Sequence, residues 1–186
     1  MSPDDARALI AHPSLSAGGP QVWADLGSGD GTFTVALASL LPAGSTVHAI
    51  DTDTRALARI PARHRDVAIV AHQSDFTILP WPFDGLDGVL MSNSLHYVRD
   101  QAAFLVRIGA ALRQRRVLLV EYDIRRGNAW VPYPIREAAA IEVFRSIGYA
   151  VATPLGRQRS VFRRGEIYGL LLTDRPASGG CDRTSY

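Results

Sequence analysis

The chain has 186 residues, of which 47% are hydrophobic and 20% are charged. This length fits one domain with a core that needs no disulfides, and the composition excludes a disordered chain, a collagen-like repeat and a coiled coil. The 20 basic residues, all arginine, and the 18 acidic residues leave a net charge of +2, too balanced to predict a basic face for nucleic acid.

Strands and helices are predicted to alternate along most of the chain. Short hydrophobic runs indicate strands, and hydrophobic residues at helical spacing, such as Phe33, Leu37 and Leu40, indicate helices. In chain order we expect a helix at 2–11, a strand at 22–26, a helix at 33–41, a strand at 46–50, a helix at 54–63, strands at 67–70 and 86–91, a helix at 102–112, a strand at 116–122, a helix at 135–147, and strands at 151–157 and 166–173.

This order predicts an α/β fold with a doubly wound, Rossmann-like sheet between two layers of helices. We expect seven strands, mostly parallel, with an antiparallel strand at one edge because no helix joins the last two. Residues 1–175 are expected to form one domain, followed by a flexible tail at 176–186. Ligands of such sheets bind beyond the carboxyl ends of the strands, so residues that follow each strand are the candidates for a site.

A glycine-rich turn, Asp25-Leu-Gly27-Ser28-Gly29-Asp-Gly31, follows the first predicted strand and opens a helix. Its glycines let a ligand approach the backbone closely, and the start of the helix offers free backbone N–H groups. A dinucleotide site would have a Gly-x-Gly-x-x-Gly pattern, but Thr32 occupies the sixth position. The carboxylate of Asp25 also suits a cationic ligand better than a pyrophosphate, so a nicotinamide oxidoreductase is the less favoured interpretation.

Five segments in order resemble those of class I S-adenosylmethionine-dependent methyltransferases. The glycine-rich turn resembles the family's cofactor motif, and Asp51 and Asp75 follow the second and third predicted strands. The segment Leu79-Pro-Trp-Pro-Phe-Asp-Gly-Leu-Asp-Gly-Val89 is similar to the one that leads into the family's fourth strand, and Ser92-Asn93-Ser-Leu-His96-Tyr-Val98 to the turn after it. The resemblance spans residues 22–123 and implies S-adenosyl-L-methionine as the cofactor.

The resemblance also implies roles for single residues. Asp51 would hold the ribose hydroxyls, Asp75 the adenine amino group, and Asp25 a cationic group or the amides of its own loop. Phe76 would either flank the adenine or belong to the core, and Asn93 would brace the loop or the cofactor. The residues expected to bind the cofactor are Asp25, Gly27, Ser28, Gly29, Gly31, Asp51, Thr52, Asp75, Phe76 and Asn93.

His96 is the candidate catalytic residue, because an imidazole with a pKa near 6.5 suits a general base at neutral pH. The structural alternative is a histidine bonded to a loop carbonyl. Tyr97, Glu121, Tyr122 and Tyr133 are candidates for the lining of the acceptor pocket. No metal is expected, because the carboxylates are dispersed and no histidine cluster exists.

The acceptor is expected to be a small molecule, because the sequence shows no inserted domain for recognising a larger one. Residues 125–134 are long and aromatic enough for a lid, or form a surface loop. The arginines of the last loop either are solvated or meet an anionic acceptor; they are Arg157, Arg159, Arg163 and Arg164. An RNA or protein methyltransferase and a non-catalytic S-adenosylmethionine-binding module stay open as alternatives.

The sequence carries no feature of an exported or membrane protein. No hydrophobic run reaches the roughly 20 residues of a membrane-spanning helix, and the acidic first residues do not resemble a secretion signal. The single cysteine, Cys181, cannot form an internal disulfide. We therefore expect a cytoplasmic protein with no membrane partner, whereas its oligomeric state is not predicted.

Overall fold

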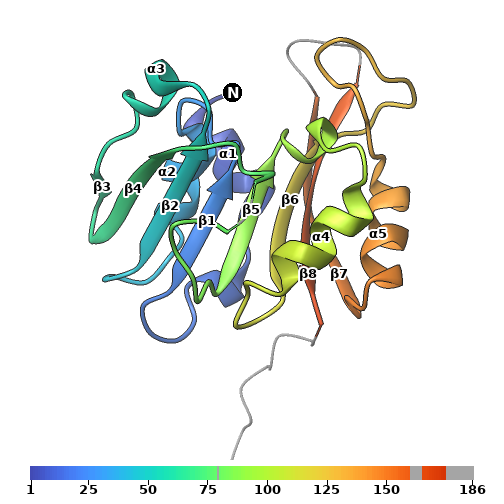
Figure 1. The fold of residues 1–186 in the computed structure, drawn as a ribbon. Coiled ribbons are helices and arrows are strands. Elements are labelled where there is room, and N and C mark those ends of the chain that lie inside the picture. The colour runs from blue at the N-terminus through green and yellow to red at the C-terminus, as the bar shows by residue number, and fades with distance from the viewer. Residues whose placement is uncertain (79, 160–164, 175–186) are drawn as a thin grey trace, which may run out of the picture.

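Figure 1 shows the computed structural model, which describes residues 1–78, 80–159 and 165–174. Its helices are α1 (Pro3–Ile10), α2 (Thr32–Ala38), α3 (Thr54–Leu57), α4 (Gln101–Gly109) and α5 (Glu137–Ser146), with short 3-10 turns η1 (Pro13–Leu15) and η2 (Leu95–Tyr97). Its strands are β1 (Val22–Leu26), β2 (Thr46–Asp51), β3 (Arg63–His64), β4 (Val67–Gln73), β5 (Gly88–Ser92), β6 (Arg116–Tyr122), β7 (Val151–Arg159) and β8 (Glu166–Thr173). Within the described ranges, no helix is long and apolar enough to cross a membrane. The predicted tail lies outside these ranges.

The described strands form one sheet in the order β3-β4-β2-β1-β5-β6-β8-β7. The five strands from β4 to β6 in this order pair in parallel, which confirms the predicted Rossmann-like, mostly parallel arrangement. The last two strands pair antiparallel, as predicted. However, β8 lies inside the sheet, where it runs antiparallel to β6, so the outermost strand on this side is β7.

The predicted count of seven strands is wrong, because β3 adds an eighth. The helix expected to reach residue 63 ends instead at Leu57. Pro61 accounts for this early end, since proline lacks the N–H that a helix needs and bars the residue before it from helical geometry. The chain then turns back through Arg65, at φ 50°, and pairs Arg63 and His64 with the start of β4.

Helices cover both faces of the sheet, which confirms the predicted three layers. In Figure 1, α4 and α5 lie in front of the sheet and α1 and α2 lie behind it. The front core includes Phe104 of α4 and Phe144 of α5, and the rear core includes Leu9 of α1 and Leu37 of α2. These two buried layers hold the parallel strands rigidly, so the turns at their carboxyl ends have fixed positions.

Candidate functional site

The glycine-rich turn lies between the carboxyl ends of β2 and β5. Gly27 and Ser28 each donate a backbone N–H to Ile50 O at 2.9 Å, which ties the turn to β2. A Cβ atom added at Gly27 would lie only 2.7 Å from the Cβ of Ser94 in the turn after β5. The turn enters α2 at Gly31, whose φ of 85° is a left-handed conformation that glycine adopts without strain.

We expect Gly27→Ala to destabilise the fold more than Gly29→Ala, a matched control in the same turn. Both glycines have positive φ, 78° and 54°, so both substitutions carry the left-handed cost of about 1–2 kcal/mol. Only at Gly27 does the added methyl group collide with a neighbour, and such overpacking costs about 1–3 kcal/mol more. Urea unfolding measures both variants, and equal losses would contradict the close approach of the two turns.

Asp51, at the end of β2, holds the glycine-rich turn through its carboxylate. Its Oδ2 accepts a hydrogen bond from the Gly29 N–H at 2.8 Å, and its Oδ1 accepts one from the Asp53 N–H at 2.9 Å. Asp53, and not Asp51, caps α3, since it accepts hydrogen bonds from the first N–H groups of that helix. Each Asp51 oxygen has a second lone pair with which it can accept from a ligand. Thr52, the next residue, is exposed.

Asp25 is fully buried at the end of β1. Its Oδ2 accepts a hydrogen bond from the Thr34 hydroxyl at 2.6 Å, whereas its Oδ1 has no partner among the described residues. Burial raises the pKa of Asp25 to about 7; the bond from Thr34 opposes this rise, and the charge of Asp51 adds to it. A cation placed at Oδ1 would therefore stabilise the ionised form of Asp25.

This raised pKa predicts that the ligand-free protein loses stability as pH rises from about 4 to about 7. In that window the folded protein keeps a proton on Asp25, because the pKa of this carboxyl group is about 7 in the fold. The unfolded chain has already lost that proton, because the pKa of the group is then its ordinary value of 3.8. Asp25→Asn removes the titration and serves as the reference. The measurement is the free energy of unfolding in urea near pH 5 and pH 7.5. The wild type should lose more stability than Asp25→Asn between these values, and a constant difference would contradict the burial effect.

Buried polar atoms without a partner lie at the carboxyl ends of β1 and β5 and in the turns that follow them. They are Asp25 Oδ1, Ser28 Oγ, Ser92 Oγ, Asn93 Oδ1 and Ser94 Oγ, and none has a hydrogen-bond partner within the described part of the chain. Buried polar atoms in proteins are nearly always hydrogen-bonded, so this cluster fits a polar ligand between the turns. Ser92 and Ser94 were not predicted as site residues, although both flank Asn93 in the quoted motif.

The two site residues predicted after the third strand differ in burial. Asp75 is exposed, and its Oδ1 accepts hydrogen bonds from the N–H and the hydroxyl of Thr77. Phe76 is buried in the front core, where its ring meets Phe104 edge-on at 5.8 Å between centroids. The same ring also borders the turn after β1, since its Cε1 lies 3.4 Å from a Cβ built at Gly27.

His96 and Glu121 form a buried pair beside this cluster. His96 Nδ1 lies 2.7 Å from Glu121 Oε2, and the His96 backbone N–H donates to Glu121 Oε1 at 3.1 Å. Both side chains are at most 2% exposed. The partner of the imidazole is thus a carboxylate, and not the loop carbonyl of the structural alternative. A carboxylate at Nδ1 holds the proton on that nitrogen and leaves the lone pair on Nε2.

Comparisons with known proteins identify the family. Residues 24–115 match the sequence pattern of the methyltransferase domain, and this segment contains the turns after β1, β2 and β5. The chain belongs to the class I S-adenosylmethionine-dependent methyltransferases. It is therefore an enzyme with S-adenosylmethionine as its cofactor, as the sequence predicted. A comparison with curated protein sequences finds no match.

Solved structures share the fold of the methyltransferase. Magnesium protoporphyrin IX methyltransferase from Synechocystis PCC 6803, with bound S-adenosylmethionine, is 15% identical, with a TM-score of 0.65 over 91% of this chain and 78% of its own. The Burkholderia thailandensis 1,6-didemethyltoxoflavin-N1-methyltransferase is 21% identical, with a TM-score of 0.64 over 93% and 78%. The plantazolicin methyltransferase BpumL is 10% identical, with a TM-score of 0.63 over 91% and 82%. These identities establish the fold alone.

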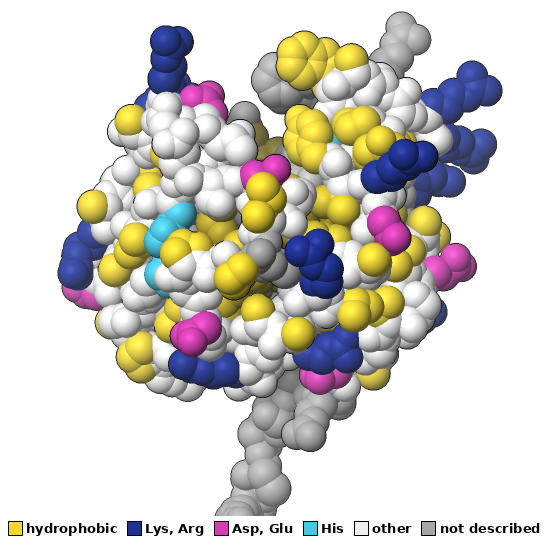
Figure 2. All heavy atoms as spheres, viewed as in Figure 1, with side chains coloured by type: hydrophobic (Ala, Val, Ile, Leu, Met, Phe, Trp, Pro, Cys, Tyr) yellow, Lys and Arg dark blue, Asp and Glu magenta, His cyan; other side chains and the backbone are white. Residues whose placement is uncertain are grey.

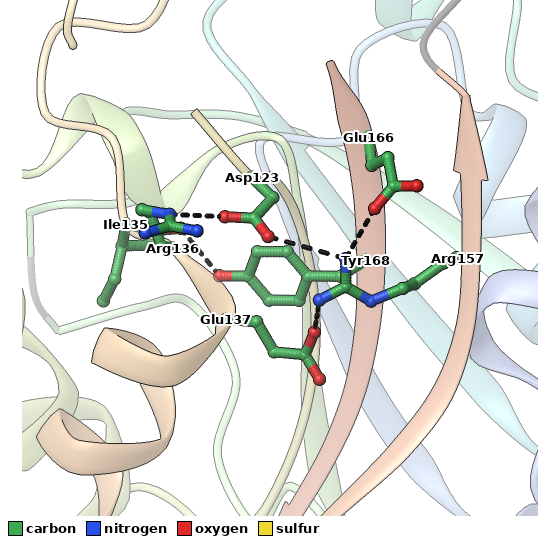
Figure 3. Close-up of polar contacts among 7 residues, drawn as sticks. All are labelled: Asp123, Ile135, Arg136, Glu137, Arg157, Glu166 and Tyr168. Carbon is green, nitrogen blue, oxygen red and sulfur yellow. Dashed lines mark hydrogen bonds and ion pairs between the residues drawn. The ribbon is translucent and has the colours of Figure 1, made fainter. Parts of the chain in front are cut away.

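The methyltransferase fixes both ends of the aromatic loop at residues 124–136 with ion pairs. Figure 3 shows Arg157 of β7 between Asp123, Glu137 and Glu166. Asp123, just before the loop, also accepts a hydrogen bond at 2.8 Å from the Nε of Arg136, its last residue. Three carboxylates thus surround Arg157, which does not favour the alternative in which this residue meets an anionic acceptor. Two other arginines of that prediction, Arg163 and Arg164, lie outside the described residues.

The same loop meets the turn that carries His96. The Tyr133 N–H donates to His96 O at 3.0 Å, and the side-chain amide of Gln101 donates to Tyr133 O at 2.8 Å. The ring centroids of His96 and Tyr97 lie 4.4 Å apart, and Tyr122 lies 6.2 Å from His96. The predicted pocket residues therefore gather around the buried pair.

Proposed function

We propose that the methyltransferase methylates a small molecule at an atom that gives up a proton, with His96 as the general base. The observation that carries this proposal is the position of the His96–Glu121 pair beside the unpartnered polar atoms after β1 and β5. The polar atoms fit a cofactor, and the pair supplies a base next to it. The evidence for a cofactor here comes from this chain's own buried polar atoms, because each of them needs a polar partner that the described part of the protein does not provide.

The cofactor would lie along the turns after β1, β2, β4 and β5. Asp25 Oδ1 would meet the cationic amino acid part of S-adenosylmethionine, since it has no partner among the described residues, and the Asp51 carboxylate would accept hydrogen bonds from the ribose hydroxyls. Asp75 keeps a carboxylate exposed for the adenine amino group, next to the ring of Phe76. The turns that hold these groups contribute the remaining residues, Gly27, Ser28, Gly29, Gly31, Thr52 and Asn93.

The chemistry of methyl transfer leaves little for the protein to do beyond positioning. When bound, S-adenosylmethionine supplies the methyl carbon, to which an acceptor lone pair forms a bond while the carbon–sulfur bond breaks and the sulfur keeps its electron pair. Nε2 of His96 takes the proton that the acceptor loses. Glu121 holds the imidazole with Nε2 as the basic nitrogen and stabilises the imidazolium that forms.

A small acceptor agrees with the surroundings of His96. The region next to it consists of side chains from η2, the end of β6 and the loop at 124–136. Among the structures of similar fold, one is named for the methylation of 1,6-didemethyltoxoflavin and another for that of magnesium protoporphyrin IX, both of which are small molecules. We extend this class of acceptor to the present chain. The cytoplasmic location stays a prediction from the sequence.

Calorimetric titration tests the proposal, followed by a transfer assay. We expect S-adenosylmethionine and S-adenosylhomocysteine to bind and NAD not to bind. Incubation with methyl-labelled S-adenosylmethionine and a metabolite extract should then label a small molecule. Label that enters RNA or protein would support the larger-acceptor alternative. Cofactor binding without transfer to any of these would support a non-catalytic binding module.

A further inference from the structure

Three aromatic side chains in η2 and in the loop at 124–136 are exposed to solvent. They are Tyr97, Trp130 and Tyr133, with exposed fractions of 54%, 71% and 41%. Every other Phe, Trp and Tyr in the described ranges is buried or half-buried. Scattered exposed hydrophobic residues need no explanation, but a cluster of them is typical of a binding site.

These rings come from two segments that are bonded to each other. Tyr97 belongs to η2 beside His96, and Tyr133 donates its backbone N–H to His96 O. Trp130 lies in a tight turn of the same loop, where its N–H donates to the side chain of Asn128 at 2.9 Å. Figure 2 shows hydrophobic side chains gathered at the top of the molecule, over the ends of β5 and β6. The two segments that carry the rings are thus joined at His96, and the loop that carries two of the rings is fixed at both ends.

The cluster is aromatic and not merely hydrophobic. Among the described residues, the exposed large aliphatic side chains are Met1, Val70, Ile78 and Val106, and none of them belongs to η2 or to the loop at 124–136. Aromatic rings bind flat π-systems in stacked or edge-on geometries that contribute about 0.5–1.5 kcal/mol beyond the area buried. A surface that binds an aliphatic ligand could use aliphatic side chains as well, and its exposed hydrophobic residues would not all be aromatic.

We propose that the acceptor is a planar aromatic molecule with an acidic hydroxyl group, held against Tyr97, Trp130 and Tyr133 with that hydroxyl at His96. This inference rests on the methyl-transfer function proposed above. The hydroxyl proton goes to Nε2 of His96, the freed oxygen pair forms the bond to the methyl carbon, and the pair of the broken carbon–sulfur bond stays on sulfur. An aromatic hydroxyl has a pKa near 10, as in tyrosine, so an imidazole can deprotonate it during transfer. An aliphatic alcohol, as weak an acid as water, is a much poorer match.

The first test compares the binding of 2-naphthol and its saturated counterpart, decahydro-2-naphthol, by calorimetry on protein saturated with S-adenosylhomocysteine, and we expect at least tenfold tighter binding of 2-naphthol. A separate assay supplies methyl-labelled S-adenosylmethionine in place of S-adenosylhomocysteine, and we expect label to enter 2-naphthol alone. Trp130→Ala and Tyr97→Ala should each weaken 2-naphthol binding about threefold to tenfold. The control Val106→Ala removes an exposed aliphatic side chain of α4, and it should leave the affinity unchanged.

The outcomes separate this inference from the function on which it rests. All of these variants should bind S-adenosylhomocysteine as the wild type does, because their substituted side chains are exposed. Suppose that the wild type binds the cofactor normally but binds the two alcohols with equal affinity, or that neither aromatic substitution changes the affinity for 2-naphthol. Either result would overturn the proposal of an aromatic acceptor and leave the proposed methyl-transfer function intact. A wild type that fails to bind S-adenosylhomocysteine would overturn the proposed function itself.

Discussion

Replacing Asp51 with alanine is expected to weaken S-adenosylmethionine binding by about 1.5–4 kcal/mol, or roughly ten- to a thousandfold in Kd. Two effects combine in this loss. The variant lacks the charged acceptor proposed for the ribose hydroxyls, and each hydrogen bond to such an acceptor contributes about 1.5–3 kcal/mol. It also frees the Gly29 N–H, so the glycine-rich turn loses one of its attachments to the end of β2. Calorimetric titration of the purified variant measures the change.

Asp53→Ala is the matched control, because it removes a carboxylate only two residues away. Asp53 caps α3, so this variant should lose about 1 kcal/mol of stability and keep its affinity for the cofactor. Asp51→Asn separates charge from shape, since the amide oxygen can still accept hydrogen bonds. If Asp51→Ala bound the cofactor as tightly as the wild type, Asp51 would have no place in the site.

The second large effect is expected in turnover, once an acceptor is known. His96→Ala should lower kcat by about 10²–10⁴, the range that a general base contributes. Glu121→Gln should also lower kcat and change its pH profile, because the neutral amide no longer stabilises an imidazolium at His96. Neither substitution should change the Kd of S-adenosylmethionine, so a comparison of turnover with calorimetry isolates the chemical step.

His64→Ala tests whether loss of any imidazole has this effect. His64 lies in β3 at the far edge of the sheet, so the variant should turn over as the wild type does. Full activity of His96→Ala would mean that the residue only supports the turn. Glu121 would have only a structural role if the activity of Glu121→Gln fell in proportion to the loss of folded protein and its pH profile stayed unchanged.

The sequence predicted most of the fold because hydrophobic periodicity reflects burial directly. Parallel strands covered on both faces read as continuous hydrophobic runs, and β1 and β6 lie within the predicted bounds. The eighth strand was missed because Arg63 and His64 form too short a segment to carry a pattern. The helix before it ends at Leu57 and not at the predicted residue 63, because Pro61 interrupts helical hydrogen bonding after an otherwise helical pattern.

The candidate site was predictable where it depends on the ends of single strands. Asp25 and Asp51 end buried strands and lie beside the glycine-rich turn, as the topology requires. The pairing of His96 with Glu121 was not predicted, because these residues lie 25 positions apart and meet only through the neighbouring strands β5 and β6. Arg157 is a similar case, since its three carboxylates come from distant segments. Contacts of this kind have no local pattern.

The most direct measurement is a crystal structure of the methyltransferase with S-adenosylhomocysteine bound. We expect its ribose hydroxyls to contact the Asp51 carboxylate and its amino group to meet Asp25 Oδ1. We also expect its sulfur to face the side of the turns where His96 lies. A product bound elsewhere, with both carboxylates directed away from it, would show that these strand ends are not the cofactor site.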